Sequence, residues 1–411
     1  MRTRKYLGVG LGVVALVAAG MGGASAEAQT RPAGWSAGRS AGWSAAWASA
    51  MQAPTAADGN WSQAGFDHQT IRQTVRMSTG GRSLRIRLSN LYGTKPLQIT
   101  GITVAGTDVT FHGSRRTTIA AGRTTTSDAV AVSTAAGEQL VVSLYVDGVT
   151  GPATFHEDGL TTTFTSAGNH LHDNAPGTAT SHAFYYLTGV DVTGAAGTIV
   201  TYGDSITNGH NSTPDVDHRY SDDLAQRLGK RRLGVANVGI SGNLLLHELP
   251  CFGEVGVTRF RRDALGQPGV RTVIVEEGEN DIWDSEFNFG CGVTPRITAD
   301  QLIAGYRSMI AAAHARGVRI IGGTITPFKA DYMQPADFAR AEAIRTQANQ
   351  WIRTSGEYDA VADFARAVGD PADEQRIDPA LDSGDHLHPN DAGYAAMAVV
   401  ASEALPGRNQ R

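Results

Sequence analysis

The chain has 411 residues, of which 41% are hydrophobic and 18% charged, a balance that is typical of a folded globular protein and excludes a disordered one. At this length the chain can form two domains with a sizeable core. The formal net charge is −5 and no basic cluster follows the N-terminus, so we expect no nucleic-acid partner.

The first residues have the pattern of an export signal. Basic Arg2, Arg4 and Lys5 precede an uncharged apolar segment at 6–23, and a small-residue cleavage pattern ends at Ala26. A membrane anchor is the alternative interpretation, but the segment is short for an anchor and rich in Gly and Ala. We therefore predict a signal peptide over 1–26 and a secreted protein without stable membrane insertion.

Residues 27–42, rich in Ala, Gly, Ser and Arg, predict a linker, and residues 43–195 an all-β antiparallel sandwich domain. Short runs there alternate apolar and polar residues and are separated by turn residues. The expected strands include 46–51, 70–77, 83–88 and 139–146. No catalytic constellation stands out in this region, which could bind glycan or simply brace the domain that follows.

From residue 196 to residue 407 strands alternate with helices. The expected strands are 199–202, 234–238, 272–276 and 318–323, and the expected helices are 221–228, 301–316, 338–353 and 392–401. Apolar strands alternating with helices predict an α/β fold, a three-layer α/β/α sandwich with a parallel sheet. Ligands on such sheets bind beyond the carboxyl ends of the strands.

Ser205 lies in such a position, in Gly203-Asp204-Ser205 directly after the first strand of this sheet. Its hydroxyl would face the crevice, and its backbone N–H would point at a bound oxyanion. A helix N-cap explains the same residue types, because Asp and Ser are common caps. The tripeptide alone therefore does not establish a nucleophile.

A base for such a serine is available before the last helix, in Asp385-His386-Leu387-His388-Pro389. A serine hydroxyl needs a base near neutral pH, and a carboxylate must orient the imidazole and stabilise its charged form. His388 and Asp385 can do this from one turn. The rival interpretation is a metal site made by Asp385, His386 and His388, which no second cluster of Cys, His or carboxylates supports.

Two further segments can supply oxyanion donors. Asn280, after the strand at 272–276, carries an amide N–H, and Gly242, after the strand at 234–238, lets the backbone N–H come close. Each segment alone is an ordinary strand-to-loop turn. All four segments in order, after successive strands and before the last helix, are hard to explain as turns.

Together these segments resemble the four sequence blocks of the SGNH/GDSL hydrolases. The matching residues are Gly203-Asp204-Ser205, Gly242, Gly278-x-Asn280-Asp281 and Asp385-x-x-His388-Pro389. The resemblance covers residues 196–407 and implies the parallel, flavodoxin-like sheet of that family. Glu279 stands where the family usually has Gly, at a position that varies.

The resemblance also implies roles for these residues. Ser205 would be the nucleophile and His388 the base, oriented by Asp385. The oxyanion hole would consist of the N–H groups of Ser205 and Gly242 and the amide of Asn280. The mechanism that follows needs neither a cofactor nor a metal.

We therefore predict a secreted serine carboxylic-ester hydrolase acting through an acyl-enzyme on short acyl esters, acetyl or aryl, of small molecules or polysaccharides. The chain is similar to secreted bacterial SGNH proteins with an N-terminal β-sandwich, some of them associated with xylan degradation. The alternatives are a lipase or lysophospholipase for longer acyl chains, and a non-catalytic carbohydrate-binding protein with a degenerate hydrolase domain. We expect a monomer.

The two cysteines of the chain, Cys251 and Cys291, are expected to form a disulfide, since an exported protein meets an oxidising compartment. If Gly242 and Asn280 converge on one oxyanion, the loops that follow them start from neighbouring points and can bring the cysteines together. Two separate buried thiols are the alternative.

Overall fold

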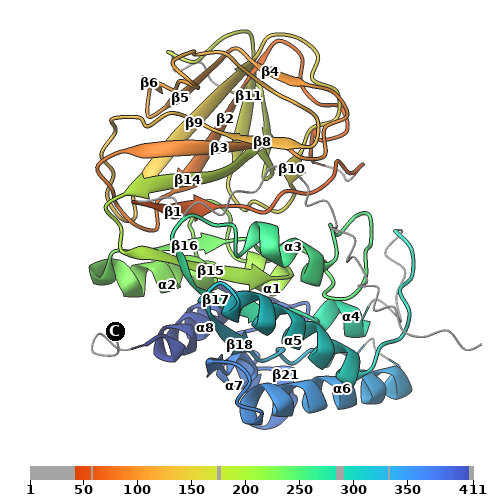
Figure 1. Cartoon of the computed structure of the whole chain (residues 1–411). Coiled ribbons are helices and arrows are strands. Elements are labelled where there is room, and N and C mark those ends of the chain that lie inside the picture. The colour runs from red at the N-terminus through yellow and green to blue at the C-terminus, as the bar shows by residue number, and fades with distance from the viewer. Residues whose placement is uncertain (1–41, 57–58, 174–176, 284–290, 332–333, 407–411) are drawn as a thin grey trace, which may run out of the picture. The chain divides into compact units, whose positions relative to one another are not determined.

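The structure, a computed structural model, describes residues 42–56, 59–173, 177–283, 291–331 and 334–406 (Figure 1). The predicted signal peptide and nearly all of the predicted linker lie outside these residues. The described residues form one compact unit. Among the described residues, no helix combines the length and the apolar character needed to cross a membrane.

Two antiparallel sheets form the β-rich part of the chain, residues 43–193. One sheet has the strand order β1 (Trp43–Ala48), β14 (Leu187–Thr193), β3 (Leu84–Asn90) and β8 (Arg123–Thr126). The other has the order β12 (Ala179–Ser181), β11 (Thr163–Ala167), β2 (Gln69–Arg76), β9 (Gln139–Val146), β5 (Gly101–Val104) and β6 (Thr107–Asp108). Two short pairs are β10 (Phe155–His156) with β13 (Phe184–Tyr185), and β4 (Leu97–Ile99) with β7 (Thr117–Ile119).

The two sheets enclose one core, as the predicted sandwich requires. Ile71 of β2 and Leu144 of β9 come from one sheet, and Ile86 of β3 and Val190 of β14 come from the other; all four are fully buried. In β3 the neighbours of Ile86, Arg85 and Arg87, are more exposed, because successive side chains of a strand point to opposite faces. The alternation in the sequence therefore identifies the inward faces correctly.

The first strand begins three residues earlier than the predicted strand at 46–51. β1 pairs with β14 from Trp43 opposite Thr193 to Ala48 opposite Gly189. This partner lies far away along the chain, and the run Trp43–Ala48 is buried almost throughout, so its ends are set by pairing and not by an alternating pattern.

Residues 197–404 form the α/β part. Its parallel sheet has the order β16 (Leu233–Asn237), β15 (Gly197–Gly203), β17 (Val270–Glu276), β18 (Arg319–Gly323) and β19 (Ala360–Ala362). With β15 as the first strand, this is the doubly wound order 2-1-3-4-5, so the flavodoxin-like prediction is confirmed. The helices are α1 (Ser205–Asn208), α2 (Tyr220–Leu228), η1 (Gly229–Arg231), α3 (Gly256–Asp263), α4 (Glu279–Trp283), α5 (Ala299–His314), α6 (Pro335–Thr354), α7 (Phe364–Val368) and α8 (Asp391–Ala404). A hairpin of β20 (Gly369–Asp370) and β21 (Asp373–Ile377) precedes α8.

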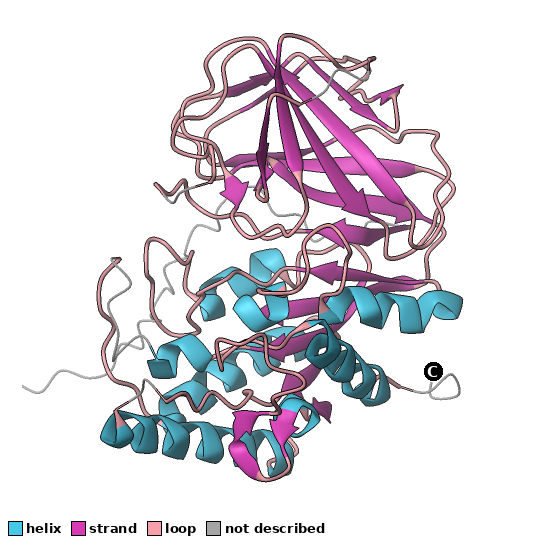
Figure 2. Cartoon of the chain, turned by 180° about the vertical axis from the view of Figure 1, so that it is seen from behind, coloured by secondary structure: helices cyan, strands magenta, loops and turns pink. Residues whose placement is uncertain are grey.

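Helices cover both faces of the parallel sheet, which gives the predicted three layers (Figure 2). Ile199 of β15 packs in one core with Met397 of α8. The next residue, Val200, points to the opposite core with Phe260 of α3 and Met309 of α5. Both faces of β15 are buried along its whole length, and its centre is accordingly apolar, as in parallel strands generally.

Candidate active site

Ser205 is the first residue of α1, and only Asp204 separates it from the strand β15. The cap of this short helix is Asp204, whose Oδ1 accepts the N–H of Ile206 at 3.0 Å. The capping interpretation therefore applies to Asp204, and the Ser205 hydroxyl is not used as the cap. Its side chain lies at the carboxyl end of the sheet, where the sequence places it, and the residue is 8% exposed.

A chain of two hydrogen bonds joins Ser205 to His388 and Asp385. His388 Nε2 lies 2.8 Å from Ser205 Oγ, and His388 Nδ1 lies 2.6 Å from Asp385 Oδ2. The other oxygen of Asp385 accepts the backbone N–H groups of Leu387 and His388. These contacts fix the ring, so that Nδ1 donates to the carboxylate and Nε2 is left to take the serine proton.

The charge of Asp385 is suited to this arrangement. Burial raises the pKa of Asp385, but the hydrogen bond and charge of His388, together with the backbone N–H groups of His388 and Leu387, outweigh burial and hold the pKa well below the ordinary value. Asn211 adds a further donor, with its Nδ2 2.8 Å from Asp385 Oδ2. The carboxylate is therefore ionised near neutral pH and can stabilise an imidazolium at His388.

His386 takes no part in this chain. Its Nδ1 lies 2.6 Å from Asp382 Oδ2, and its side chain is 46% exposed. Its φ of 65° turns the backbone between Asp385 and His388, so the two histidine rings serve different carboxylates. In the part of the chain that the structure describes, no three His, Cys, Asp or Glu side chains are grouped as a metal site would be.

The two predicted oxyanion segments are hydrogen-bonded to each other. Asn280 Nδ2 donates to the backbone carbonyl of Asn243 at 2.9 Å, one residue after Gly242. The next side chain, Asp281, is fully buried and accepts the N–H groups of Leu245 and Leu246 at 2.6 and 2.9 Å. The loop after β16 and the start of α4 are thus held together, and the second N–H of the Asn280 amide can serve an oxyanion.

Gly242 needs to be glycine for two reasons. Its φ is 75°, in the left-handed region, and a Cβ there would lie 2.2 Å from Cδ1 of Phe252. Any other residue would therefore displace either the backbone or the phenylalanine ring.

Arg259, which the sequence analysis did not single out, joins the ends of two strands to the loop after Gly242. It is fully buried and donates to the carbonyls of Gly203 and Val238, both at 2.8 Å, and to Asn243 Oδ1 at 2.6 Å. Its guanidinium also lies 4.2 Å from the ring centre of Tyr202. One side chain thus fixes the strand before Ser205 relative to the loop after Gly242.

Three buried glutamates, Glu276, Glu277 and Glu279, lie at the end of β17 and the start of α4. Burial raises the pKa of each well above the ordinary value. Each also has one oxygen, Oε1, without a hydrogen-bond partner among the described residues. Burial thus favours the uncharged form of all three carboxyl groups, and for Glu277 the guanidinium of Arg259, with Nη2 3.4 Å from Oε2, opposes this effect.

Glu279→Gln should make the stability of the protein fall less as the pH rises from 5 to 8. Above the ordinary pKa of 4.5 the unfolded chain releases the proton that folded Glu279 keeps, so stability falls as pH rises until the folded pKa is passed. The variant lacks this contribution. The urea midpoint of the wild type should therefore fall more between pH 5 and pH 8 than that of the variant. An equal fall in both would contradict the assignment, and Glu403→Gln, at an exposed position of α8, is the control.

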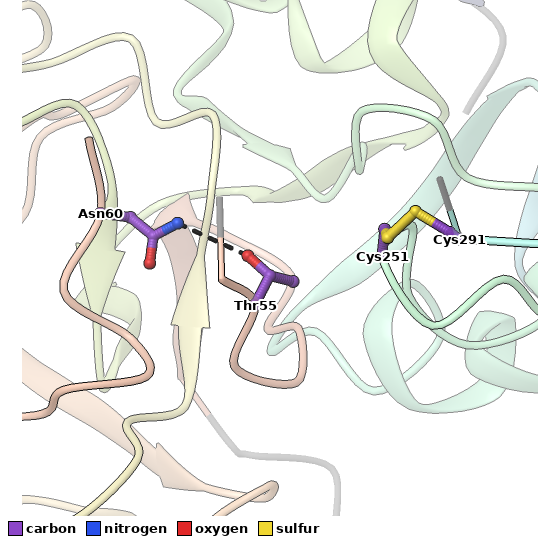
Figure 3. The surroundings of a disulfide bond; sticks show 4 residues. All are labelled: Thr55, Asn60, Cys251 and Cys291. Carbon is purple, nitrogen blue, oxygen red and sulfur yellow. Dashed lines mark hydrogen bonds between the residues drawn. A yellow bond between two sulfur atoms is a disulfide. The ribbon is translucent and has the colours of Figure 1, made fainter. Parts of the chain in front are cut away.

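Cys251 and Cys291 form a disulfide with a Cα–Cα distance of 6.0 Å, in agreement with the sequence prediction (Figure 3). Cys251 lies between β16 and α3, and Cys291 between α4 and α5. The bond therefore joins the loops that leave the two oxyanion segments.

Replacing both cysteines by Ser should lower the free energy of unfolding by about 3–4 kcal/mol, because the bond closes a loop of 40 residues in the unfolded chain. Urea unfolding of the variant and of the untreated wild type gives the difference. Two alkylatable thiols in the unreduced wild-type protein would contradict the assignment.

The β-rich part reaches the site, which the sequence analysis did not expect. Asp158 Oδ2 accepts hydrogen bonds from His210 Nδ1 at 2.7 Å and from Ser241 Oγ at 2.8 Å. His210 lies soon after Ser205 in the sequence and could have been noticed as a second histidine of the block. Asp158 has no local signal, because only folding brings it to the α/β part.

Comparison with known proteins bears on the α/β part. Residues 201–396 match the family model of the GDSL-like Lipase/Acylhydrolase family. No curated protein matches the chain.

Similar solved structures include a G-D-S-L family protein from Desulfitobacterium hafniense, with 19% identity, 51% of this chain and 99% of the other covered, and a TM-score of 0.38. A GDSL-like lipase from Bacteroides thetaiotaomicron has 17% identity, covers 51% of this chain and 87% of its own, and has a TM-score of 0.39. A variant of an acetyl-xylooligosaccharide esterase from Geobacillus has 20% identity to this chain. The match covers 51% of this chain and 94% of the esterase, with a TM-score of 0.37.

Proposed function

Residues 201–396 belong to the GDSL-like lipase/acylhydrolase family, which makes the chain a carboxylic ester hydrolase, and from this premise we propose that it cleaves short acyl esters through an acyl-enzyme on Ser205. The observation that carries the proposal is the hydrogen-bonded chain from Ser205 Oγ through His388 to Asp385. Three groups of this chemistry in this order are what a serine nucleophile requires.

In the first half of the reaction, Ser205 Oγ attacks the ester carbonyl carbon while its proton passes to His388 Nε2. The oxyanion that forms accepts hydrogen bonds from the N–H groups of Ser205 and Gly242 and from the Asn280 amide. The tetrahedral intermediate then collapses, the bond to the alcohol oxygen breaks, and the alcohol takes the proton from His388.

In the second half, water replaces the alcohol. It gives a proton to His388 as its oxygen adds to the acyl carbon, and the same donors hold the new oxyanion. The bond to Ser205 Oγ breaks, the serine recovers its proton, and the carboxylic acid leaves. Asp385 stays ionised throughout and stabilises the imidazolium of each half-reaction.

The polar surroundings of the site support a short acyl group and a hydroxylated alcohol. Side chains hydrogen-bonded around Ser205 and His388 include Asn211, Ser241 and the partly exposed His210. A long acyl chain gains its binding energy from apolar surface, which these side chains do not offer. Acetylated polysaccharide is therefore the polymeric substrate that we propose, and the predicted signal peptide would bring the enzyme to it outside the cell.

A series of p-nitrophenyl esters from acetate to palmitate, assayed beside acetylated xylan, tests the proposal. We expect kcat/KM to be highest for the shortest acyl chains. A maximum at palmitate would favour the lipase alternative. No turnover of any ester, together with no labelling of Ser205 by an organophosphate, would favour a binding protein.

A further inference from the structure

Asp158 lies in the segment between β10 and β11, and its carboxylate accepts hydrogen bonds from two loops of the α/β part. Its side chain is 18% exposed, and both of its donors, His210 Nδ1 and Ser241 Oγ, reach the same oxygen, Oδ2. A carboxylate that accepts two hydrogen bonds from separate loops fixes the distance between them.

Each of the two donors is next to a group of the reaction. Ser241 directly precedes Gly242, whose N–H belongs to the proposed oxyanion hole. The ring of His210 lies 4.7 Å from the ring of His388, centre to centre. The backbone of His210 is anchored to the nucleophile, since its N–H donates to the carbonyl of Ser205 at 2.9 Å. A shift of Asp158 would therefore disturb both the oxyanion loop and the surroundings of the base.

The backbone of Asp158 is itself held by the helix that carries the nucleophile. Asn208, the last residue of α1, donates through Nδ2 to the carbonyl of Asp158 at 2.7 Å and lies 3.3 Å from Ser241 Oγ. Its Oδ1 lies 3.0 Å from Nε2 of the fully buried His156, on the strand before Asp158. The contact is thus a network with several buried members, and not an isolated surface hydrogen bond.

Electrostatics agree with the geometry. Burial raises the pKa of Asp158, but the hydrogen bond and charge of His210, the hydrogen bond from Ser241 and the charge of His156 together outweigh burial and lower the pKa below the ordinary value. The same hydrogen bond raises the pKa of His210. Asp158 is therefore ionised when the enzyme works at neutral pH.

We propose that Asp158, supplied by the β-rich part, is a positioning residue of the active site that sets the oxyanion loop through Ser241 and buttresses His388 through His210. This inference rests on the proposed function. It gives the β-rich part a role in the reaction itself, in place of the bracing or glycan binding considered from the sequence.

Two variants of Asp158 separate position from charge. Asp158→Ala removes the acceptor, whereas Asp158→Asn can place its amide oxygen where Oδ2 lies and accept from both donors. We expect Asp158→Ala to lower kcat on p-nitrophenyl acetate by roughly 10- to 100-fold with KM changed less than about threefold, because small displacements of reacting groups cost this much. Asp158→Asn should recover kcat to within about threefold of the wild type.

The control is Arg76→Met. It breaks another ion pair between the same two parts, from Arg76 to Asp217 at 3.2 Å, which involves none of the site residues. We expect this variant to keep the kcat of the wild type even if its unfolding midpoint falls. All rates are normalised by organophosphate titration of Ser205, so that unfolded protein does not count as lost catalysis.

Three results would overturn the inference: a normalised kcat of Asp158→Ala within about threefold of the wild type, an equal loss in Asp158→Asn, or an equal loss in Arg76→Met. Failure of the proposed function looks different, because the wild type itself would then neither turn over esters nor react with the organophosphate. A double variant of Asp158→Ala and Ser241→Ala should cost little more than Asp158→Ala alone, since Asp158→Ala already removes the hydrogen bond through which Ser241 is held.

Discussion

Ser205→Ala and His388→Ala should each lower kcat by at least about three decades while the protein stays folded, because each removes a member of the nucleophile–base pair. The 2.8 Å contact between Ser205 Oγ and His388 Nε2 is the basis of this expectation. Both variants delete only a few atoms at a partly enclosed position, so unfolding midpoints should change little. The combined variant should be no worse than either alone, since neither residue activates anything without the other.

The matched control for the base is His386→Asn. His386 is the other histidine of the same turn and pairs with Asp382 at 2.6 Å, away from Ser205. Asn suits its φ of 65° better than Ala, because Asn tolerates the left-handed region. We expect the kcat of this variant to be lower than that of the wild type by about tenfold at the most. An inactive His386→Asn beside an active His388→Ala would show that the base has been assigned to the wrong histidine.

The order of strands and helices in the α/β part follows from the sequence because its signals are local. Apolar strands, amphipathic helices and turn residues each depend on neighbours in the chain. The strand β17 ends at the predicted residue 276, and the helix α5 ends two residues before the predicted 316. The four segments of the site can also be recognised in the sequence, since each lies at the end of a strand or before the start of a helix.

What the sequence could not predict depends on contacts between distant segments. The bounds of β1 are set by its partner β14, and the buried Arg259 has the sequence neighbourhood of an ordinary surface helix. Asp158 belongs to the same class. Its functional partners, His210 and Ser241, are brought to it only by folding, so no spacing or periodicity marks it.

This distinction also explains why the site is more elaborate than its motif. The motif names the groups that we propose to touch the reacting atoms, namely Ser205, His388 and the oxyanion donors. Two other residues hold these groups in place. Arg259 donates to the backbone carbonyl of Gly203, and Asp158, from the β-rich part, accepts the hydroxyl of Ser241. Such contacts place few demands on the neighbouring sequence, but catalysis requires them, since reacting groups must be held within fractions of an ångström.

Asn280→Ala should lower kcat by roughly 10²–10³ with a smaller effect on KM, as removal of one oxyanion donor does. The amide is suited to this role because only one of its two N–H groups is used by the carbonyl of Asn243, at 2.9 Å. The other can strengthen its bond as negative charge develops on the ester oxygen. The loss therefore falls on the transition state and not on substrate binding.

A purely structural role for Asn280 predicts the opposite pattern. If its amide only joined α4 to the loop after β16, the variant would be less stable but would keep its activity per folded molecule. Asn349→Ala provides the matched control, because Asn349 is buried and its Nδ2 donates to the carbonyl of Ile325 at 2.8 Å. That variant should lose stability and keep the kcat of its folded fraction. An Asn280→Ala enzyme that behaved in the same way, with kcat unchanged after titration of Ser205, would remove Asn280 from the oxyanion hole.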